Sequence, residues 1–159
     1  MITFASPEMI ADLKLIWKKS FGDPDWYINF FFERRFKPED TLVFLDCDKP
    51  VSMFFLIPAG LFVKGEYKTV LYVYGVSTLP EYRGRGISRA LLQYANCNMP
   101  YNAAATFLCP ASESLFDFYG KQGYNSAFYL KEIELEYNDI SEAIDCRLEL
   151  EDAEAKLYK

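Results

Sequence analysis

The sequence predicts a single domain with a mixed α/β (α+β) fold, in which helices pack on a sheet of both parallel and antiparallel strands. Residues 70–78 and 103–109 are apolar, strand-like segments on either side of a helical segment, and such a strand–helix–strand unit places its strands in parallel. Residues 41–46 and 51–57 lie across a short turn, which is typical of an antiparallel hairpin. A chain of 159 residues that is 51% hydrophobic is long enough for one domain with a buried core.

The N-terminal segment is expected to form one short strand and two helices. Residues 2–4 are the strand, and Ser6 followed by Pro7 is typical of the start of a helix. Apolar residues recur at helical spacing up to Phe21 and Gly22, where we expect the first helix to end. Residues 23–25 interrupt this pattern and cap a second helix at residues 26–34, which is rich in aromatic side chains.

The middle of the chain is expected to form strands joined by turns. A turn at residues 48–50 joins the strands at 41–46 and 51–57, and a bulge or edge break is expected at residues 58–60 before a short extension at 61–63. Residues 64–66 turn the chain into the strand at 70–78. Gly75 lies inside that strand, where a glycine indicates either a β-bulge or the close packing of a neighbour, and the sequence leaves both open.

The stretch between the strand at 70–78 and the next helix, residues 89–96, has the properties of an anion-binding loop. A turn at residues 79–82 is followed by two glycines and two arginines, namely Arg83, Gly84, Arg85 and Gly86. Free N–H groups and the dipole at a helix N-terminus favour a phosphate, glycines allow close approach, and arginines add positive charge. A tight turn without a ligand is the alternative. The third glycine of a dinucleotide-binding turn and the Gly-Lys-Ser/Thr of a Walker loop are both absent.

The C-terminal part is expected to add one helix and two strands. Residues 100–102 form a loop, and Ser112 caps a helix at residues 113–121 that Gly123 ends. A long strand at residues 124–136 and a final strand at 144–150 follow. We therefore assign residues 1–150 to one domain and residues 151–159 to a C-terminal tail that begins like a further helix.

The composition argues against several classes of protein. The net charge of −6 argues against a nucleic-acid-binding surface, and no apolar run is long enough to cross a membrane. The chain has no histidine, which excludes Ser-His-Asp and Cys-His nucleophile systems and histidine-containing metal sites. No secretory signal pattern is found at the N-terminus. Four cysteines without CxxC spacing predict reduced thiols in a cytoplasmic protein with no bound metal: Cys47, Cys97, Cys109 and Cys146.

Two segments resemble the signature of the GCN5-related N-acetyltransferase (GNAT) family. The family's acyl-CoA pattern is Gln or Arg, two residues, Gly, one residue, then Gly or Ala, and its positions are filled here by Arg83, Gly86 and Ser88. Ser88 departs from the pattern, but it is small and keeps its N–H group. A second family pattern is an aliphatic or aromatic residue, then Tyr, three residues, Gly and an aromatic residue, and it is filled by Phe118, Tyr119, Gly123 and Tyr124.

The resemblance implies a fold and a cosubstrate. The fold is a mixed central sheet of about six or seven strands, with a V-shaped splay between two parallel central strands and helices on both faces. The cosubstrate is acetyl-CoA, with its pyrophosphate on the amides of Arg85 to Ser88 and its pantetheine arm paired like an extra strand with residues 76–78. The cofactor-binding residues that the resemblance implies are Val76, Ser77, Thr78, Arg83, Gly84, Arg85, Gly86, Ile87 and Ser88.

The resemblance also implies a catalytic tyrosine. Tyr119 corresponds to the tyrosine that faces the CoA sulfur in the family, and a phenol can donate a proton to a developing thiolate. The alternative is that Tyr119 packs the helix and hydrogen-bonds the cofactor. No histidine can serve as general base, so the base is left unassigned between a water chain and four acidic residues: Glu33, Glu81, Glu113 and Asp117.

By this resemblance the protein is an acetyl-CoA-dependent N-acetyltransferase that acts on a primary amine of a small molecule or a protein. The alternative is a non-catalytic acyl-CoA-binding or regulatory module with the same fold. The aromatic residues at 26–32 either pack the core or wall an acceptor pocket, as this segment often does in the family. A homodimer is left open, and a looser resemblance to two-domain members predicts that a second domain follows this one.

Overall fold

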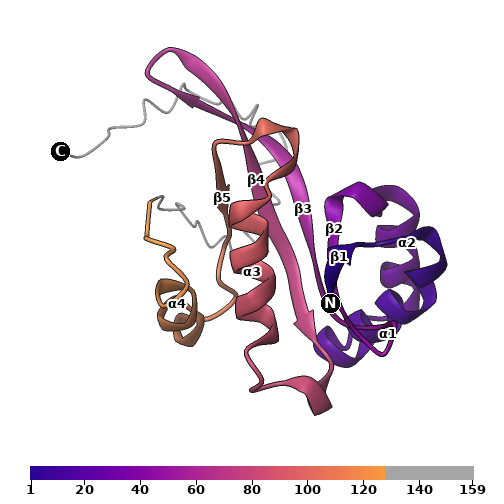
Figure 1. Ribbon diagram of the computed structural model, residues 1–159. Coiled ribbons are helices and arrows are strands. Elements are labelled where there is room, and N and C mark those ends of the chain that lie inside the picture. Colours follow the sequence, from indigo (N-terminus) through magenta and orange to yellow (C-terminus); the bar gives the residue numbers. More distant parts are fainter. Residues whose placement is uncertain (128–159) are drawn as a thin grey trace, which may run out of the picture. The chain divides into compact units, whose positions relative to one another are not determined.

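The computed structural model describes residues 1–127, and within them five strands form one sheet in the order β1-β2-β3-β4-β5 (Figure 1). The first four pair antiparallel, and β4 and β5 pair in parallel, so the predicted mixed sheet is confirmed. Five described strands are fewer than the expected six or seven. The predicted long strand begins at residues 124–127, which are not in a strand. The rest of this predicted strand, the predicted strand at 144–150 and the C-terminal tail all lie outside the described residues. The strands are β1 (Ile2–Phe4), β2 (Thr41–Asp46), β3 (Lys49–Val63), β4 (Glu66–Thr78) and β5 (Ala105–Phe107).

The two N-terminal helices are close to their predicted positions. A short 3-10 turn at Pro7–Met9 leads into α1 (Ile10–Phe21), and α2 (Asp25–Arg35) follows. Gly22 ends α1 in the left-handed region with φ of 73°, a conformation that glycine adopts without penalty. As predicted, Ser6 and Pro24 occupy the N-cap positions of the two helical segments, although neither makes a side-chain hydrogen bond to the helix backbone.

The hairpin of β3 and β4 is longer than predicted. Its strands pair without interruption from Phe55 and Tyr74 out to Val63 and Glu66, so the bulge expected at residues 58–60 is wrong. Pairing of β2 with β3 stops at Phe55, and the outer part of β3 therefore has a strand on one side only in the described chain. A proline is tolerated in a strand at such an edge, which explains why Pro58 does not break β3.

Gly75 forms the predicted bulge in β4. Met53 pairs with Ser77 and Phe55 with Tyr74, so the two residues at 75 and 76 lie opposite the single residue at 54. Gly75 has φ of 66°, as the first residue of a glycine-type bulge requires. The alternative reading also holds, because a Cβ at this position would lie 3.3 Å from the Trp17 side chain. Both reasons for a glycine therefore apply at once.

Helices cover both faces of the sheet, as predicted, and each face has its own core (Figure 1). Strand alternation sends Met53 and Phe55 of β3 toward α1 and α2, while Phe54 and Leu56 point to the opposite face. There they pack with α3 (Ile87–Cys97) and with partly buried side chains of α4 (Glu113–Gly120). The sheet is thus fixed from both sides along the part of β4 that leads to the bulge.

The parallel strands β4 and β5 separate after a short contact. Strand β5 has three residues rather than the predicted seven, and its register runs from Val70–Ala105 to Tyr72–Phe107. Beyond Tyr72, β4 continues to Thr78 with no neighbouring strand on this side among residues 1–127. This separation is the splay that the family resemblance implies, and it leaves one edge of β4 open next to α4.

Candidate active site

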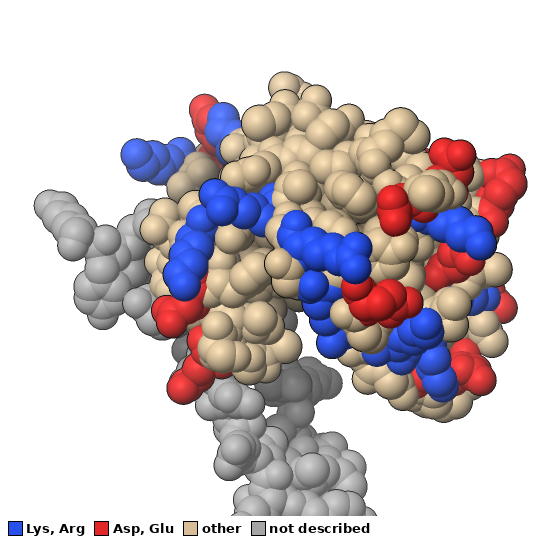
Figure 2. Space-filling model, turned by 60° about the horizontal axis from the view of Figure 1, so that its bottom comes forward, with Lys and Arg blue, Asp and Glu red and all other residues tan. Residues whose placement is uncertain are grey.

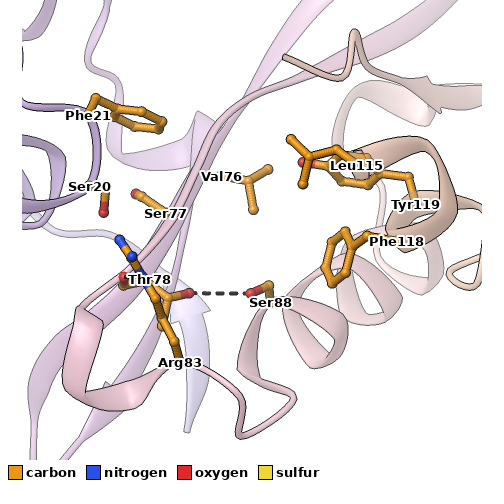
Figure 3. A pocket seen from close by; sticks show the side chains of 10 residues that line it. All are labelled: Ser20, Phe21, Val76, Ser77, Thr78, Arg83, Ser88, Leu115, Phe118 and Tyr119. Atoms are coloured by element: carbon orange, nitrogen blue, oxygen red, sulfur yellow. Dashed lines mark hydrogen bonds between the residues drawn. The ribbon is translucent and has the colours of Figure 1, made fainter. Parts of the chain in front are cut away.

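A pocket of about 250 Å³ lies where the parallel strands separate. The end of β4 lies between its two sides, with the C-terminal turn of α1 on one side and α4 on the other (Figure 3). The loop after β4 and the first turn of α3 complete the lining. The lining residues are Ser20, Phe21, Val76, Ser77, Thr78, Arg83, Ser88, Leu115, Phe118 and Tyr119.

The loop between β4 and α3 exposes backbone N–H groups beside this pocket. Ala90 donates the first intrahelical hydrogen bond of α3 to the Gly86 oxygen (3.0 Å), so the N–H groups of the preceding residues in the first turn have no partner within the helix. Gly84 and Gly86 have φ of 74° and 75°, and a Cβ at either would meet nothing within 4 Å. The glycines therefore serve the backbone conformation, and the space beside them is open to a ligand. Such a helix start fits an anion such as a phosphate.

The two arginines of the loop are held differently. Arg83 donates from Nε to the Thr78 backbone oxygen (3.1 Å), which leaves its terminal nitrogens beside the pocket (Figure 3). Arg85 donates to the Glu81 backbone oxygen (2.8 Å), and its guanidinium lies 4.9 Å from the centre of the Tyr82 ring. Arg83 is therefore a lining residue, whereas the side chain of Arg85 contacts other residues of the loop and does not line the pocket.

Positive side chains surround the loop although the chain carries a formal charge of −6. On the face that holds the start of α3, Figure 2 shows Lys and Arg side chains in a broken row with acidic side chains between them. Arg83 and Arg85 of the loop and Arg89 of the first turn of α3 are exposed, and Lys19 of α1 approaches Glu81 at 3.7 Å. A local excess of arginine over an open helix N-terminus favours an anionic ligand on this face.

Hydrogen bonds fix the end of β4 beneath the pocket. The Ser52 hydroxyl donates to the Ser77 backbone oxygen and contacts the Thr78 hydroxyl, both at 2.8 Å. Thr78 in turn contacts the Ser88 hydroxyl at 3.3 Å (Figure 3). The serine that departs from the family pattern thus links the first turn of α3 to β4, a contact that glycine or alanine could not make.

Tyr119 lies on α4 and reaches the pocket from the side opposite to α1 (Figure 3). Burial raises the pKa of its phenol above the ordinary value of 10, and the nearby Tyr124 and Tyr72 raise it further. Tyr119 therefore stays protonated at neutral pH and is a donor. Tyr124, which packs against it, contacts the Thr106 hydroxyl at 2.9 Å and so links this end of α4 to β5.

The structure brings together some of the predicted site residues and not others. Side chains of Val76, Ser77, Thr78, Arg83 and Ser88 line the pocket with that of Tyr119. Those of Arg85 and Ile87 do not, and Ile87 is buried in the core, so only its N–H group could serve a ligand. Gly84 and Gly86 contribute backbone alone.

None of the acidic residues considered as general base lines the pocket, and all four are exposed: Glu33, Glu81, Glu113 and Asp117. Among residues 1–127, no three acidic or cysteine side chains are grouped as metal ligands, and no helix is both long and apolar enough to cross a membrane. The aromatic residues of α2 also stay out of the pocket. Phe32 is buried, Tyr27 and Phe31 pack against the core, and Trp26 and Phe30 are 71% and 56% exposed.

Sequence reasoning missed the α1 side of the pocket. Ser20 and Phe21 lie in the last turn of α1, far from either motif in the chain. The Ser20 hydroxyl is buried and has no hydrogen-bond partner in the described part of the chain. No local pattern marks these residues, because only the packing of α1 against β4 brings them to the pocket.

Comparison with known proteins identifies the family. Residues 2–127 match the family model described as an acetyltransferase (GNAT) domain. The chain therefore belongs to the GNAT family and is an acyltransferase. Curated proteins include no match to it.

Several solved structures share the fold at low sequence identity. An acetyltransferase from Trypanosoma brucei has a TM-score of 0.63 at 18% identity, over 85% of this chain and 99% of that chain. A GCN5-related N-acetyltransferase from Anabaena variabilis has a TM-score of 0.62 at 24% identity, over 74% of this chain and 30% of that chain. An aminoglycoside N-acetyltransferase in complex with CoA has a TM-score of 0.69 at 13% identity, over 85% and 93% of the two chains. At these identities the similarity establishes the fold.

Proposed function

We propose that this acyltransferase moves the acetyl group of acetyl-CoA to the nitrogen of a primary amine. The observation that carries the proposal is one pocket that joins the free N–H groups at the N-terminus of α3, an open strand edge and a protonated tyrosine. A relative in fold, the aminoglycoside N-acetyltransferase, was crystallised with CoA, which supports the same cosubstrate here.

The residues around the pocket fit the three parts of acetyl-CoA. The N–H groups from Arg85 to Ser88 and the guanidinium of Arg83 are donors for the pyrophosphate. Residues 76–78 have an open strand edge, whose N–H and C=O groups can pair with the amides of the pantetheine arm. Tyr119 lies across the pocket from this edge, where the thioester sulfur would follow the pantetheine.

The reaction needs a neutral amine and a stabilised leaving thiolate. The nitrogen forms a bond to the acetyl carbon, the carbon–sulfur bond breaks, the ammonium gives up two protons in all, and one proton ends on the thiol. The strand amides near Val76 can donate to the carbonyl oxygen as negative charge develops on it. Tyr119 donates to the thiolate as it forms.

The raised pKa of Tyr119 limits its ability to act as a general acid toward the CoA sulfur. A phenol with a pKa above 10 is a weaker acid than a thiol, whose pKa is about 8.5, so complete proton transfer from the phenol to sulfur is uphill. Tyr119 therefore stabilises the developing thiolate by a strong hydrogen bond, and water restores any proton that it gives. Since no carboxylate from residues 1–127 lines the pocket, we also propose that water carries the proton away from the amine.

The exposed thiols favour a reducing compartment. Cys47, Cys97 and Cys109 are free and exposed, and such thiols persist in the cytoplasm rather than in an oxidising environment. We therefore propose a cytoplasmic location.

The proposed reaction is tested by release of CoA thiol from acetyl-CoA in the presence of a panel of primary amines. Wild-type protein should turn over, and Tyr119→Phe should lower kcat by ~10²-fold with CoA affinity little changed. The matched control is Tyr124→Phe, which removes a half-buried hydroxyl outside the pocket and should change kcat less than about threefold. CoA binding without turnover on any amine would indicate an acyl-CoA-binding module instead. A Tyr119→Phe effect as small as the control's would remove Tyr119 from the chemistry.

A further inference from the structure

Asp23 places a half-buried carboxylate in the short connection between α1 and α2, close to the α1 side of the pocket. Its Oδ2 accepts a hydrogen bond from Trp17 Nε1 at 2.7 Å. The neighbouring Lys18 donates to the Asp23 backbone oxygen (3.0 Å) but forms its ion pair with Asp25, at 2.9 Å. Within residues 1–127, no lysine or arginine forms an ion pair with the Asp23 carboxylate, so it can serve as the partner of a cationic ligand.

The carboxylate lies among aromatic rings that stay neutral. The pKa of Tyr74 is raised well above its ordinary value. Burial is the largest cause, followed by the adjacent Tyr27, then Tyr72 and the charge of Asp23. The rings of Trp17 and Tyr74 are 5.9 Å apart between centroids, and those of Trp17 and Tyr27 are 6.5 Å apart. Tyr27 and Tyr74 are both partly exposed. Aromatic faces beside a carboxylate attract a cation through both groups.

Phe21 connects these rings to the pocket. Phe21, which lines the pocket, packs edge-on against Trp17 at 5.3 Å and is 46% exposed. In the other direction the Tyr72 ring lies 5.7 Å from the Tyr74 ring and stacks on Phe107 of β5 at 5.0 Å. We call the partly exposed rings of Phe21, Tyr27, Tyr72 and Tyr74 the aromatic wall.

We infer that the aromatic wall and Asp23 bind the acceptor, and that the acceptor is a small primary amine with an aromatic or branched apolar body. This inference rests on the proposed acetyl transfer, because it names the amine that receives the acetyl group and places it beside the pocket, where Phe21 is shared by the pocket and the aromatic wall. An amine arrives mainly as an ammonium ion at neutral pH, and Asp23 supplies its counter-charge. The apolar body packs on rings that the chain leaves partly exposed, and the buried Ser20 hydroxyl is available to a polar group of the ligand.

The class of acceptor is tested with three amines at saturating acetyl-CoA, namely 2-phenylethylamine, ethylamine and glucosamine. The wall predicts that kcat/KM for 2-phenylethylamine exceeds that for ethylamine by ~10- to 100-fold, the discrimination that an apolar site can give. It also predicts that the hydroxylated glucosamine is a poor acceptor. A higher kcat/KM for glucosamine than for 2-phenylethylamine would overturn the inference.

The role of Asp23 is tested with Asp23→Asn, which removes the charge but keeps an oxygen for the Trp17 N–H. We expect KM for 2-phenylethylamine to rise at least tenfold while KM for acetyl-CoA is unchanged. The neutral analogue 2-phenylethanol should inhibit Asp23→Asn as strongly as it inhibits wild type. If Asp23 had only a structural role, inhibition by 2-phenylethanol would weaken as well. Asp25→Asn is the matched control, because Asp25 lies two residues away with its side chain 83% exposed, and it should change KM less than twofold.

Two further measurements separate the possible failures. If Asp23→Asn melts at a lower temperature than wild type, Tyr27→Leu is used as the test variant instead. Tyr27→Leu should raise KM for 2-phenylethylamine severalfold. If wild-type protein binds CoA and acetylates amines while Asp23→Asn and Tyr27→Leu behave like Asp25→Asn, the acceptor inference is wrong and the proposed function stands. If wild-type protein does not bind CoA in a calorimetric titration, the proposed function falls and this inference with it.

Discussion

The indole of Trp17 packs against Gly75 so closely that a Cβ at residue 75 would lie 3.3 Å from its Cζ3 atom. The same glycine forms the bulge of β4, with φ of 66°, immediately before the residues that line the pocket. The other end of the indole donates to Asp23. One side chain of α1 therefore connects the bulge in the central strand to the carboxylate of the proposed acceptor site.

Replacing Gly75 with Ala should destabilise the fold by about 1 to 3 kcal/mol. The positive φ strains any L-residue, and the new Cβ would press on the Trp17 ring. Gly60→Ala is the matched control on the neighbouring strand, where a Cβ would meet only the Tyr67 ring at an ordinary 3.8 Å. Urea unfolding measures both variants. Equal free energies of unfolding for the two would show that neither the strain nor the contact at Gly75 matters.

Replacing Arg83 with Ala should weaken CoA binding and make the remaining affinity less sensitive to salt, because a charged partner of the phosphates is lost. We expect a loss of roughly tenfold, the effect of one charge-assisted hydrogen bond. Titrations of CoA at low and high salt measure both quantities. Arg34→Ala removes an exposed arginine from the last turn of α2 and should leave both unchanged. An unchanged salt response in Arg83→Ala would assign the pyrophosphate to backbone amides alone.

Tyr101 should make stability depend on pH in the alkaline range. Its hydroxyl donates to the buried carboxylate of Asp40, and this bond raises the pKa of Tyr101 to about 12 from 10. Folding therefore favours the protonated phenol. The resulting stabilisation is complete below pH 10 and is lost as the pH rises through 12.

The test compares wild type with Tyr101→Phe by chemical unfolding at several pH values. The wild type should be more stable at pH 8, and the difference should shrink between pH 10 and 12. Tyr67→Phe is the control, since Tyr67 is 80% exposed. A difference between wild type and Tyr101→Phe that stays constant up to pH 12 would contradict a pKa raised by Asp40.

Local sequence predicted most of the elements because their signals are contiguous. Strand β2 and the start of α3 follow from short apolar runs and the glycine loop, and the bulge follows from one glycine in a strand. The sequence predicts too short a β3, because Pro58 and Gly60 are typical of a strand break. In the structure both are accommodated, since β3 is paired on one side only at these positions. Strand β5 was predicted too long, since its apolar run continues after its pairing with β4 stops at Phe107.

The pocket could be predicted only in part, for a similar reason. Its residues from β4, α3 and α4 belong to two motifs that can be recognised in the chain. Ser20 and Phe21 carry no local signal, because their place depends on how α1 packs against β4 through Trp17. The predicted second domain and the homodimer stay predictions.

The central claim is that the N-terminus of α3 binds the pyrophosphate of CoA, and a calorimetric titration of CoA into three proteins tests it most directly. Wild-type protein should bind with a Kd between about 1 µM and 1 mM, the usual range for such a cosubstrate. Gly86→Ala adds only strain, since its Cβ would meet nothing within 4 Å, and should weaken binding less than about tenfold. Gly86→Glu adds a like charge against the phosphates and should bind no CoA that calorimetry detects. Wild-type affinity in Gly86→Glu would contradict the account.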